Sequence, residues 1–127
     1  MGPERRWAVA ALWLFKCGFV LSAAVIFVLA VMPAHSAPSL LPWDKAQHFL
    51  AFYVLTVVAG AAFARSPIVL IGALMIGFGG AIELVQAIPF VHRDAEWGDL
   101  FADTVGVLAA ALPLVLASWR RAWRPGS

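Results

Sequence analysis

DKAQHFLAFYVL, residues 44–55, places charged and imidazole side chains directly before a long apolar run. The rest of the chain leaves little room for a polar surface. Hydrophobic residues make up 63% of it and charged residues 13%, and the mean hydropathy is +0.89. A globular domain needs more polar residues than this to cover its outer face. The composition therefore excludes an ordinary water-soluble domain and predicts a membrane protein.

Four segments are long and apolar enough to cross a bilayer, for which about 20 residues suffice. They are residues 15–32, 46–64, 68–88 and 100–119. Because 127 residues leave room for one domain only, we predict a single all-α domain over residues 1–127, a four-transmembrane-helix bundle. The apolar stretch from Trp7 to Met32 exceeds the roughly 7–15 residues of a signal-peptide core. We therefore expect a first membrane helix there, although Ala34–Ala37 offers small residues for cleavage.

The arginines are concentrated on one side of the predicted membrane. They precede the first helix, follow the last one and occupy the turn between the second and third: Arg5, Arg6, Arg65, Arg120, Arg121 and Arg124. The positive-inside rule then puts both termini and the Arg65 turn in the cytoplasm, and residues 44–48 on the outer side. The basic ends are explained by this topology, so we expect no nucleic-acid partner.

Three pairs of polar side chains, each about one helical turn apart, lie near the predicted outer ends of the last three helices. They are Asp44 and His48, Glu83 and Gln86, and Asp99 and Asp103. Residues at this spacing share one helix face. An ionisable group inside a membrane segment costs about 2.5–3.5 kcal/mol, so Glu83 should face the bundle and find a partner. The candidates are His48, Lys45 and Arg93.

Small residues favour close approach of the helices. Ala102, Gly106 and Ala110 form a small-xxx-small stripe on the last helix, and Pro113 lies farther along it. The third helix contributes Gly72, Gly77, Gly79 and Gly80. Helices in a bilayer associate through such contacts, because lipid supplies no hydrophobic driving force. Pro113 removes one backbone donor and is a candidate kink.

DKAQHFLAFYVL together with GGAIELVQAIPFVHRDAEWGDLFADTVG resembles the VanZ-like family of small bacterial membrane proteins. The family pattern has Asp-Lys, two residues, His-Phe, then Glu-x-x-Gln, an Arg, and Asp-x-x-x-Asn-x-x-Gly. The positions that match it are Asp44, Lys45, His48, Glu83, Gln86, Arg93, Asp99 and Gly106. Asp103 departs from it, since the family usually has Asn there. The resemblance covers roughly residues 40–112 and implies a bacterial plasma membrane protein, with a namesake associated with low-level resistance to the glycopeptide teicoplanin.

Each candidate residue also has a structural interpretation. Asp44 can cap a helix and Lys45 can contact headgroups, which is the interpretation we favour for Lys45. Gln86 can hold helices together, and Asp99 suits the positive end of a helix dipole. Lys16 is expected to reach the inner interface without a role in the site.

Three classes of function follow. The first is a binding or accessory protein whose outer polar pocket engages an envelope lipid, a peptidoglycan precursor or a glycopeptide. The second is an intramembrane enzyme with His48 as general base or metal ligand. The third is a structural subunit of a larger membrane complex. We favour the first, with membrane lipids and an envelope precursor or protein partner in contact with the chain, and we assign no catalytic residue.

No metal and no cofactor are expected from the sequence. The single cysteine, Cys17, excludes a disulfide within the chain and a Cys-based metal site. A histidine among carboxylates is able to bind zinc, but Lys45 and Arg93 can neutralise acids without a metal. Because the polar residues include more acids than bases, either some carboxyls are protonated or a cation is bound.

The predicted topology is checked by labelling single cysteines from outside the cell in a Cys17→Ser background. Ser39→Cys and Ala95→Cys should react with an impermeant reagent, while Ser66→Cys and Gly126→Cys should react only after the membrane is opened. The reverse labelling would place the polar residues on the cytoplasmic side.

Overall fold

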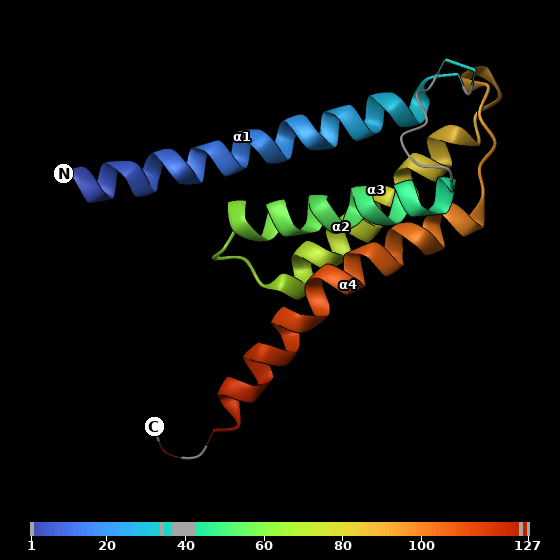
Figure 1. The fold of residues 1–127 in the computed structure, drawn as a ribbon. Helices are drawn as coiled ribbons and strands as arrows, with labels where there is room; N and C mark the ends of the chain where they lie inside the picture. Colours follow the sequence, from blue (N-terminus) through green and yellow to red (C-terminus); the bar gives the residue numbers. More distant parts are fainter. Residues whose placement is uncertain (1, 34, 37–42, 125, 127) are drawn as a thin grey trace.

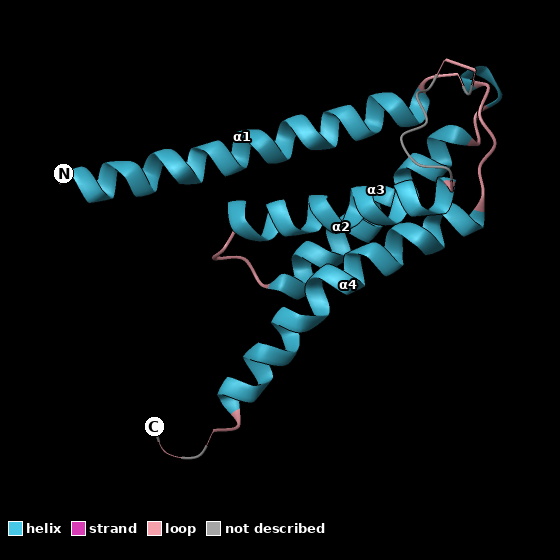
Figure 2. Cartoon of the chain, in the orientation of Figure 1, coloured by secondary structure: helices cyan, strands magenta, loops and turns pink. Residues whose placement is uncertain are grey.

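The computed structural model describes residues 2–33, 35–36, 43–124 and 126, and its regular elements are all helical (Figures 1 and 2). They are α1 (Pro3–Val31), α2 (Asp44–Ala62), α3 (Ile68–Gln86), the short 3-10 helix η1 (Pro89–Val91) and α4 (Trp97–Ala122). All four α-helices are long and apolar enough to cross a membrane. The prediction of an all-α protein with four membrane-spanning helices is confirmed. Residues 37–42, which include Ser39 and part of the cleavage-like stretch, lie outside the described residues.

The helix bounds differ from the predicted ones for local reasons. α1 begins at Pro3 instead of residue 15, because proline is well suited to the first helical position and no further proline occurs before Pro33. α3 ends at Gln86, since Pro89 begins a separate 3-10 turn. α4 begins at Trp97, which puts Asp99 in its first turn.

The helices alternate in direction. α1 and α3 run towards one end of the bundle and α2 and α4 run away from it, so the start of α1 and the end of α4 lie on the same side of the bundle as the turn between α2 and α3 (Figure 1). The opposite end, at which α2 and α4 begin, is called the polar end below. α2 packs most extensively against α4 and also contacts α1, and α3 packs against α4.

The core lies between α2, α3 and α4. Its buried residues are Phe52, Leu55, Ala59, Ile71, Met75, Ile82 and Val107. α1 has no buried residue and covers the core from one side. It does so with a stripe of helical period formed by Phe19, Ala23, Ile26 and Ala30, while side chains such as Leu14 and Leu21 stay exposed, as expected for a lipid-facing surface.

α2 and α4 approach each other closely at Gly106. A methyl group placed on its Cα would collide with the backbone carbonyl oxygen of Phe49 and crowd the backbone nitrogen of Tyr53. Ala102 and Ala110, the other two residues of the predicted small-residue stripe, are buried as well. The stripe therefore lies on the buried face of α4, and its central glycine lets the two backbones meet. α4 continues through Pro113, and its ribbon turns away from the bundle in that half (Figure 1).

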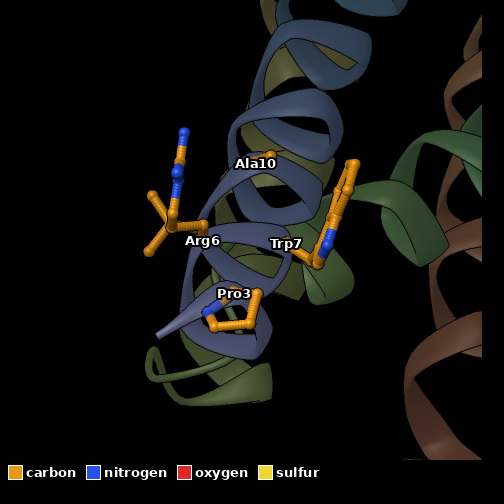
Figure 3. Close-up of a pocket in the computed structure, with 5 residues that line it drawn as sticks. Pro3, Arg6, Trp7 and Ala10 are labelled. Carbon is orange, nitrogen blue, oxygen red and sulfur yellow. The ribbon is translucent and has the colours of Figure 1, made fainter. Parts of the chain in front are cut away.

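The end opposite the polar end carries basic and aromatic side chains. An open recess along the first turns of α1 is lined by Pro3, Arg6, Trp7, Val9 and Ala10 (Figure 3). Farther along α1, the Lys16 Nζ lies 5.2 Å from the Trp13 ring centroid and 5.9 Å from that of Phe63 at the end of α2. Lys16 is thus held by cation–π contacts near this end of the bundle. None of the recess residues is acidic or an imidazole, so the candidate site lies elsewhere.

The contact at Gly106 predicts that replacing this glycine by alanine destabilises the protein, although the same change elsewhere in a helix usually stabilises it. Gly106→Ala should lower the free energy of unfolding by about 1–3 kcal/mol, because the added methyl forces α2 and α4 apart. Gly77→Ala is the matched control: a methyl at Gly77 meets nothing within 4 Å, so the change should raise stability by up to about 1 kcal/mol. Unfolding by a denaturing detergent in mixed micelles measures both. Equal effects of the two substitutions would contradict the close contact.

Candidate functional site

Seven ionisable side chains gather at the polar end of the bundle. This polar-end cluster consists of Asp44, Lys45, His48, Glu83, Glu96, Asp99 and Asp103. The first turns of α2 supply Asp44, Lys45 and His48, and the last turn of α3 supplies Glu83. Asp99 and Asp103 lie in the first two turns of α4, and Glu96 is the residue before this helix. Alternating helix directions bring these three chain segments to the same end of the bundle.

Lys45 is the cation of the cluster and makes two ion pairs. Its Nζ lies 2.5 Å from Asp99 Oδ1 and 2.6 Å from Glu96 Oε2. Asp99 is buried, whereas the Glu96 side chain is 58% exposed, so the Asp99 pair is the better shielded of the two. The sequence favoured contact of Lys45 with lipid headgroups; the structure shows its side chain in ion pairs at the start of α4.

His48 is held against Asp103 in the interior. Its Nδ1 lies 2.8 Å from Asp103 Oδ1, and the Asp103 side chain is fully buried. When Asp103 is ionised, its carboxylate accepts this hydrogen bond, Nδ1 carries the hydrogen, and a neutral imidazole keeps its lone pair on Nε2. The contact with Asp103 thus fixes the orientation of the His48 ring.

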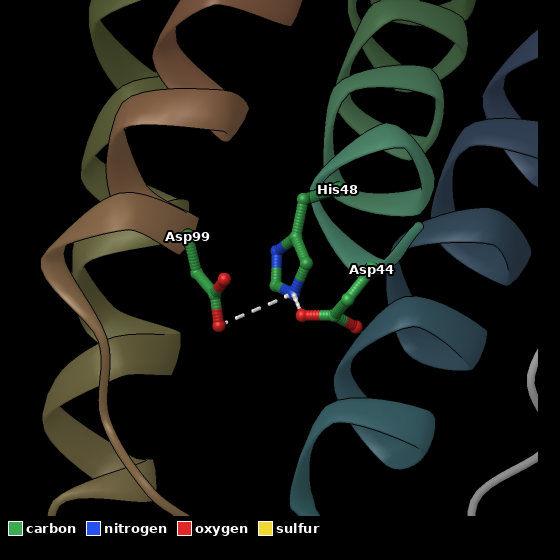
Figure 4. Close-up of side chains that lie close together, drawn as sticks. All are labelled: Asp44, His48 and Asp99. Atoms are coloured by element: carbon green, nitrogen blue, oxygen red, sulfur yellow. Dashed lines mark ion pairs between the residues drawn. The ribbon is translucent and has the colours of Figure 1, made fainter. Parts of the chain in front are cut away.

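Nε2 of His48 faces two more carboxylates (Figure 4). It lies 3.5 Å from Asp99 Oδ2 and 3.9 Å from Asp44 Oδ2. The ligand atoms of Asp44, His48 and Asp99 all lie within 4.8 Å of one another. The separations of 3.5 and 3.9 Å exceed the usual hydrogen-bond range, so Nε2 of His48 is near both carboxylates without a hydrogen bond to either.

Glu83 faces the bundle interior, as its position predicted, and it is 7% exposed. Its partner differs from those expected. Oε2 accepts a hydrogen bond of 2.9 Å from the backbone N–H of Glu96, and no hydrogen bond joins it to Lys45, His48 or Arg93 among the described residues. Glu96 is the residue that precedes α4, where backbone N–H groups have no partner within the helix. Sequence reasoning missed Glu96, although its place three residues before Asp99 is a signal for the same helix start.

Gln86 and Arg93 lie outside the polar-end cluster. Gln86 is buried, and its Nε2 donates to the carbonyl oxygen of Ala30, which ties α3 to the last turn of α1. Its structural interpretation therefore describes it best. Arg93 is half-buried in the loop between η1 and α4, and it forms no ion pair within the described part of the chain. The expectation that Arg93 helps to neutralise the acids has no support in these contacts.

Two glycines make room for the charged side chains. A methyl at Gly98 would meet the Lys45 side chain at 2.9 Å, and a methyl at Gly79 would meet Asp103 Oδ2 at 3.0 Å. Gly98 therefore opens the path of Lys45 to Asp99, and Gly79 lets α3 lie against the buried carboxylate. Larger residues at either position would displace a member of the cluster.

The polar-end cluster holds more acid than base. It contains five carboxylates, one lysine and one histidine. Two buried carboxylate oxygens, Glu83 Oε1 and Asp103 Oδ2, have no hydrogen-bond partner among the described residues. Buried anionic oxygens are costly unless a positive charge or a donor lies nearby. The arrangement is therefore suited to receive a positively charged species.

No protein-family model, no curated protein and no solved structure matches the chain. The resemblance to the VanZ-like family stays a prediction.

The two ion pairs of Lys45 predict that the stability lost on substitution of Lys45 is recovered to different extents by neutralising Asp99 or Glu96. Lys45→Met should lower the free energy of unfolding by about 1–3 kcal/mol, because it leaves Asp99 buried and unpaired. Adding Asp99→Asn should recover most of this loss, whereas adding Glu96→Gln should recover little, since exposed pairs contribute about 0–1 kcal/mol. Detergent unfolding of the two double variants and the three single ones measures the difference. Equal recovery in both double variants would contradict the assigned pairing.

Proposed function

We propose that the chain is a VanZ-like binding or accessory protein of the bacterial plasma membrane. Its polar-end cluster holds the polar group of an envelope lipid, of a peptidoglycan precursor or of a glycopeptide. The resemblance of residues 40–112 to the VanZ-like family supports this class of ligand. The positive-inside distribution of arginines supports an outward-facing site.

The observation that carries the proposal is the graded exposure of one connected set of charges. The side chain of Asp44 is 64% exposed, that of His48 16% and that of Asp103 0%. A ligand that approaches from the surface thus meets Asp44 first, then the imidazole, with Asp103 fixed behind it. Asp44 and the Nε2 atom of His48 therefore offer polar contacts on the accessible side of the cluster.

The charge of the cluster limits what binds there. Lys45 neutralises part of Asp99 and Glu96, while Asp44, Glu83 and Asp103 have no lysine or arginine partner among the described residues. A bound species that brings positive charge, either as an amine of the headgroup or as a cation bound with it, would balance these acids. Polar groups with an amine occur in lipids, in peptidoglycan precursors and in glycopeptides alike.

An enzyme is the second candidate, and one observation favours it. His48 is oriented by a buried carboxylate at 2.8 Å and presents Nε2 towards the exposed side. A histidine held in this way serves as a general base in many active sites. The described part of the cluster lacks a serine, threonine or cysteine nucleophile, so water or a ligand hydroxyl would be the group that His48 activates.

Binding of defined ligands to the full chain in nanodiscs tests the proposal. The probes are phosphatidylethanolamine, phosphatidylglycerol, a lipid-linked peptidoglycan precursor and teicoplanin, each followed by native mass spectrometry. We expect one probe to bind at one copy per chain, and Asp44→Asn and His48→Gln to weaken it at least tenfold. A mass change of the probe that requires His48 would identify the enzyme instead.

Asp94→Asn is the matched control, because Asp94 is an exposed acid of the loop before α4 and lies outside the cluster. It should leave binding unchanged. If every probe binds the parent and the variants equally, the lipids are a general annulus and the proposal fails. It also fails if the folded parent binds none of the probes.

A further inference from the structure

We propose that Asp44, His48 and Asp99 form a binding site for a divalent transition-metal ion of the zinc type. Asp103 acts as a positioning residue behind His48. The inference goes beyond the proposed function, since the ion is bound by the chain's own side chains whether or not a headgroup is present. It also replaces the expectation that Lys45 and Arg93 make a metal unnecessary.

The three ligand atoms are close to the spacing that zinc requires. Zinc–nitrogen and zinc–oxygen distances of about 2.0–2.2 Å set neighbouring atoms of a tetrahedral site about 3.3–3.6 Å apart. His48 Nε2 and Asp99 Oδ2 are already 3.5 Å apart, and His48 Nε2 and Asp44 Oδ2 are 3.9 Å apart. The Asp44 and Asp99 ligand atoms lie within 4.8 Å of each other. Asp44 is the first residue of α2 and mostly exposed, so its side chain has room to rotate towards the other two ligands.

The two carboxylate oxygens of Asp99 face different side chains. Its Oδ1 accepts from Lys45 at 2.5 Å, and its Oδ2 faces His48 Nε2. Lys45 therefore holds the carboxylate in the orientation that a monodentate metal ligand needs. The lysine does not compete for Oδ2, because its second partner is Glu96 on the exposed side.

The environment of Asp103, which contacts Nδ1 of His48, is consistent with a cation bound at Nε2 on the opposite side of the ring. Asp103 is 0% exposed, receives one hydrogen bond from His48, and its Oδ2 has no hydrogen-bond partner within the described residues. A buried carboxyl this poorly satisfied is stabilised either by taking up a proton or by positive charge nearby. A metal ion on Nε2 supplies it through the ring, in the carboxylate–histidine–metal arrangement by which proteins orient a metal-bound imidazole.

The donor set selects the class of ion. One imidazole nitrogen with two carboxylate oxygens suits Zn²⁺, whereas Mg²⁺ and Ca²⁺ prefer oxygen ligands alone. Three protein ligands leave at least one coordination position free, as in open zinc sites. The mostly exposed Asp44 puts that position on the side from which a ligand would arrive.

Metal binding is tested on the full chain, purified in detergent and freed of metal with a chelator. Titration calorimetry should show one Zn²⁺ per chain, and the melting temperature should rise with Zn²⁺ and fall again with chelator. Mg²⁺ and Ca²⁺ at the same concentration should do neither. Co²⁺ should give the visible absorption of a nitrogen and oxygen site of low coordination number.

Variants assign the ligands. His48→Gln and Asp44→Asn should each weaken Zn²⁺ binding at least tenfold, and Asp44→Asn should leave the fold intact because that side chain is exposed. Asp103→Asn keeps an acceptor for the Nδ1 hydrogen, so it should weaken binding about tenfold with an unchanged Co²⁺ spectrum, whereas Asp103→Leu should weaken it further. His92→Asn, at an exposed histidine of the same end, is the matched control and should have no effect.

The proposal is overturned if the folded parent binds no Zn²⁺, or if Asp44→Asn and Asp103→Leu bind it as tightly as the parent. Binding that is lost in His92→Asn instead would assign the ion to a surface histidine. Because no headgroup is present in this experiment, failure here leaves the proposed function untouched. A chain that binds Zn²⁺ but none of the four lipid and glycopeptide probes would overturn the proposed function alone.

Discussion

The backbone contact between Gly106 and Phe49 is the constraint on which the polar-end cluster depends. Phe49 directly follows His48, and Gly106 lies one turn after Asp103, so the contact brings His48 and Asp103 within 2.8 Å. One turn closer to the end, the same pair of helices brings Lys45 to Asp99. A bulkier residue at 106 would separate α2 from α4 and lengthen both interactions together, because helices move as rigid elements. Close packing of small residues is thus what makes short contacts between charged side chains possible here.

The charged side chains between α2 and α4 differ in how deeply they are buried. The lysine pairs with the exposed Glu96 and the buried Asp99, and its long side chain is still 28% exposed. The deepest acid, Asp103, is left with the imidazole as its only described hydrogen-bond partner. A permanently charged lysine at that depth would lose most of its hydration, whereas a histidine can remain neutral or carry charge as its surroundings require. The cluster therefore keeps its adjustable group, His48, at the point where its acids lack a fixed counter-charge.

The sequence predicts the helices and the pairs on each of them well, because both follow from local spacing. Apolar length indicated four spans, and the i,i+4 spacing placed Asp44 and His48 on one face. Partners between helices were harder to predict. They depend on how far one helix is shifted along another, and a shift of one residue moves a side chain by about 1.5 Å along the axis and to another face. For this reason Lys45 was assigned to headgroups and Arg93 to the cluster, and the backbone N–H of Glu96 was not considered as a partner of Glu83.

Helix ends explain why so acidic a cluster is compatible with this fold. α2 and α4 both begin at the polar end, so two sets of unpaired N–H groups and two positive dipole ends face the carboxylates. Asp44 and Asp99 each lie in the first turn of such a helix, and Glu83 accepts the N–H of the residue that caps α4. These partial charges act within about one turn and do not reach Asp103 deeper in α4. Helix dipoles and Lys45 thus account for the outer acids, and the charge that remains to be balanced lies at His48 and Asp103, where a bound cation has the most to contribute.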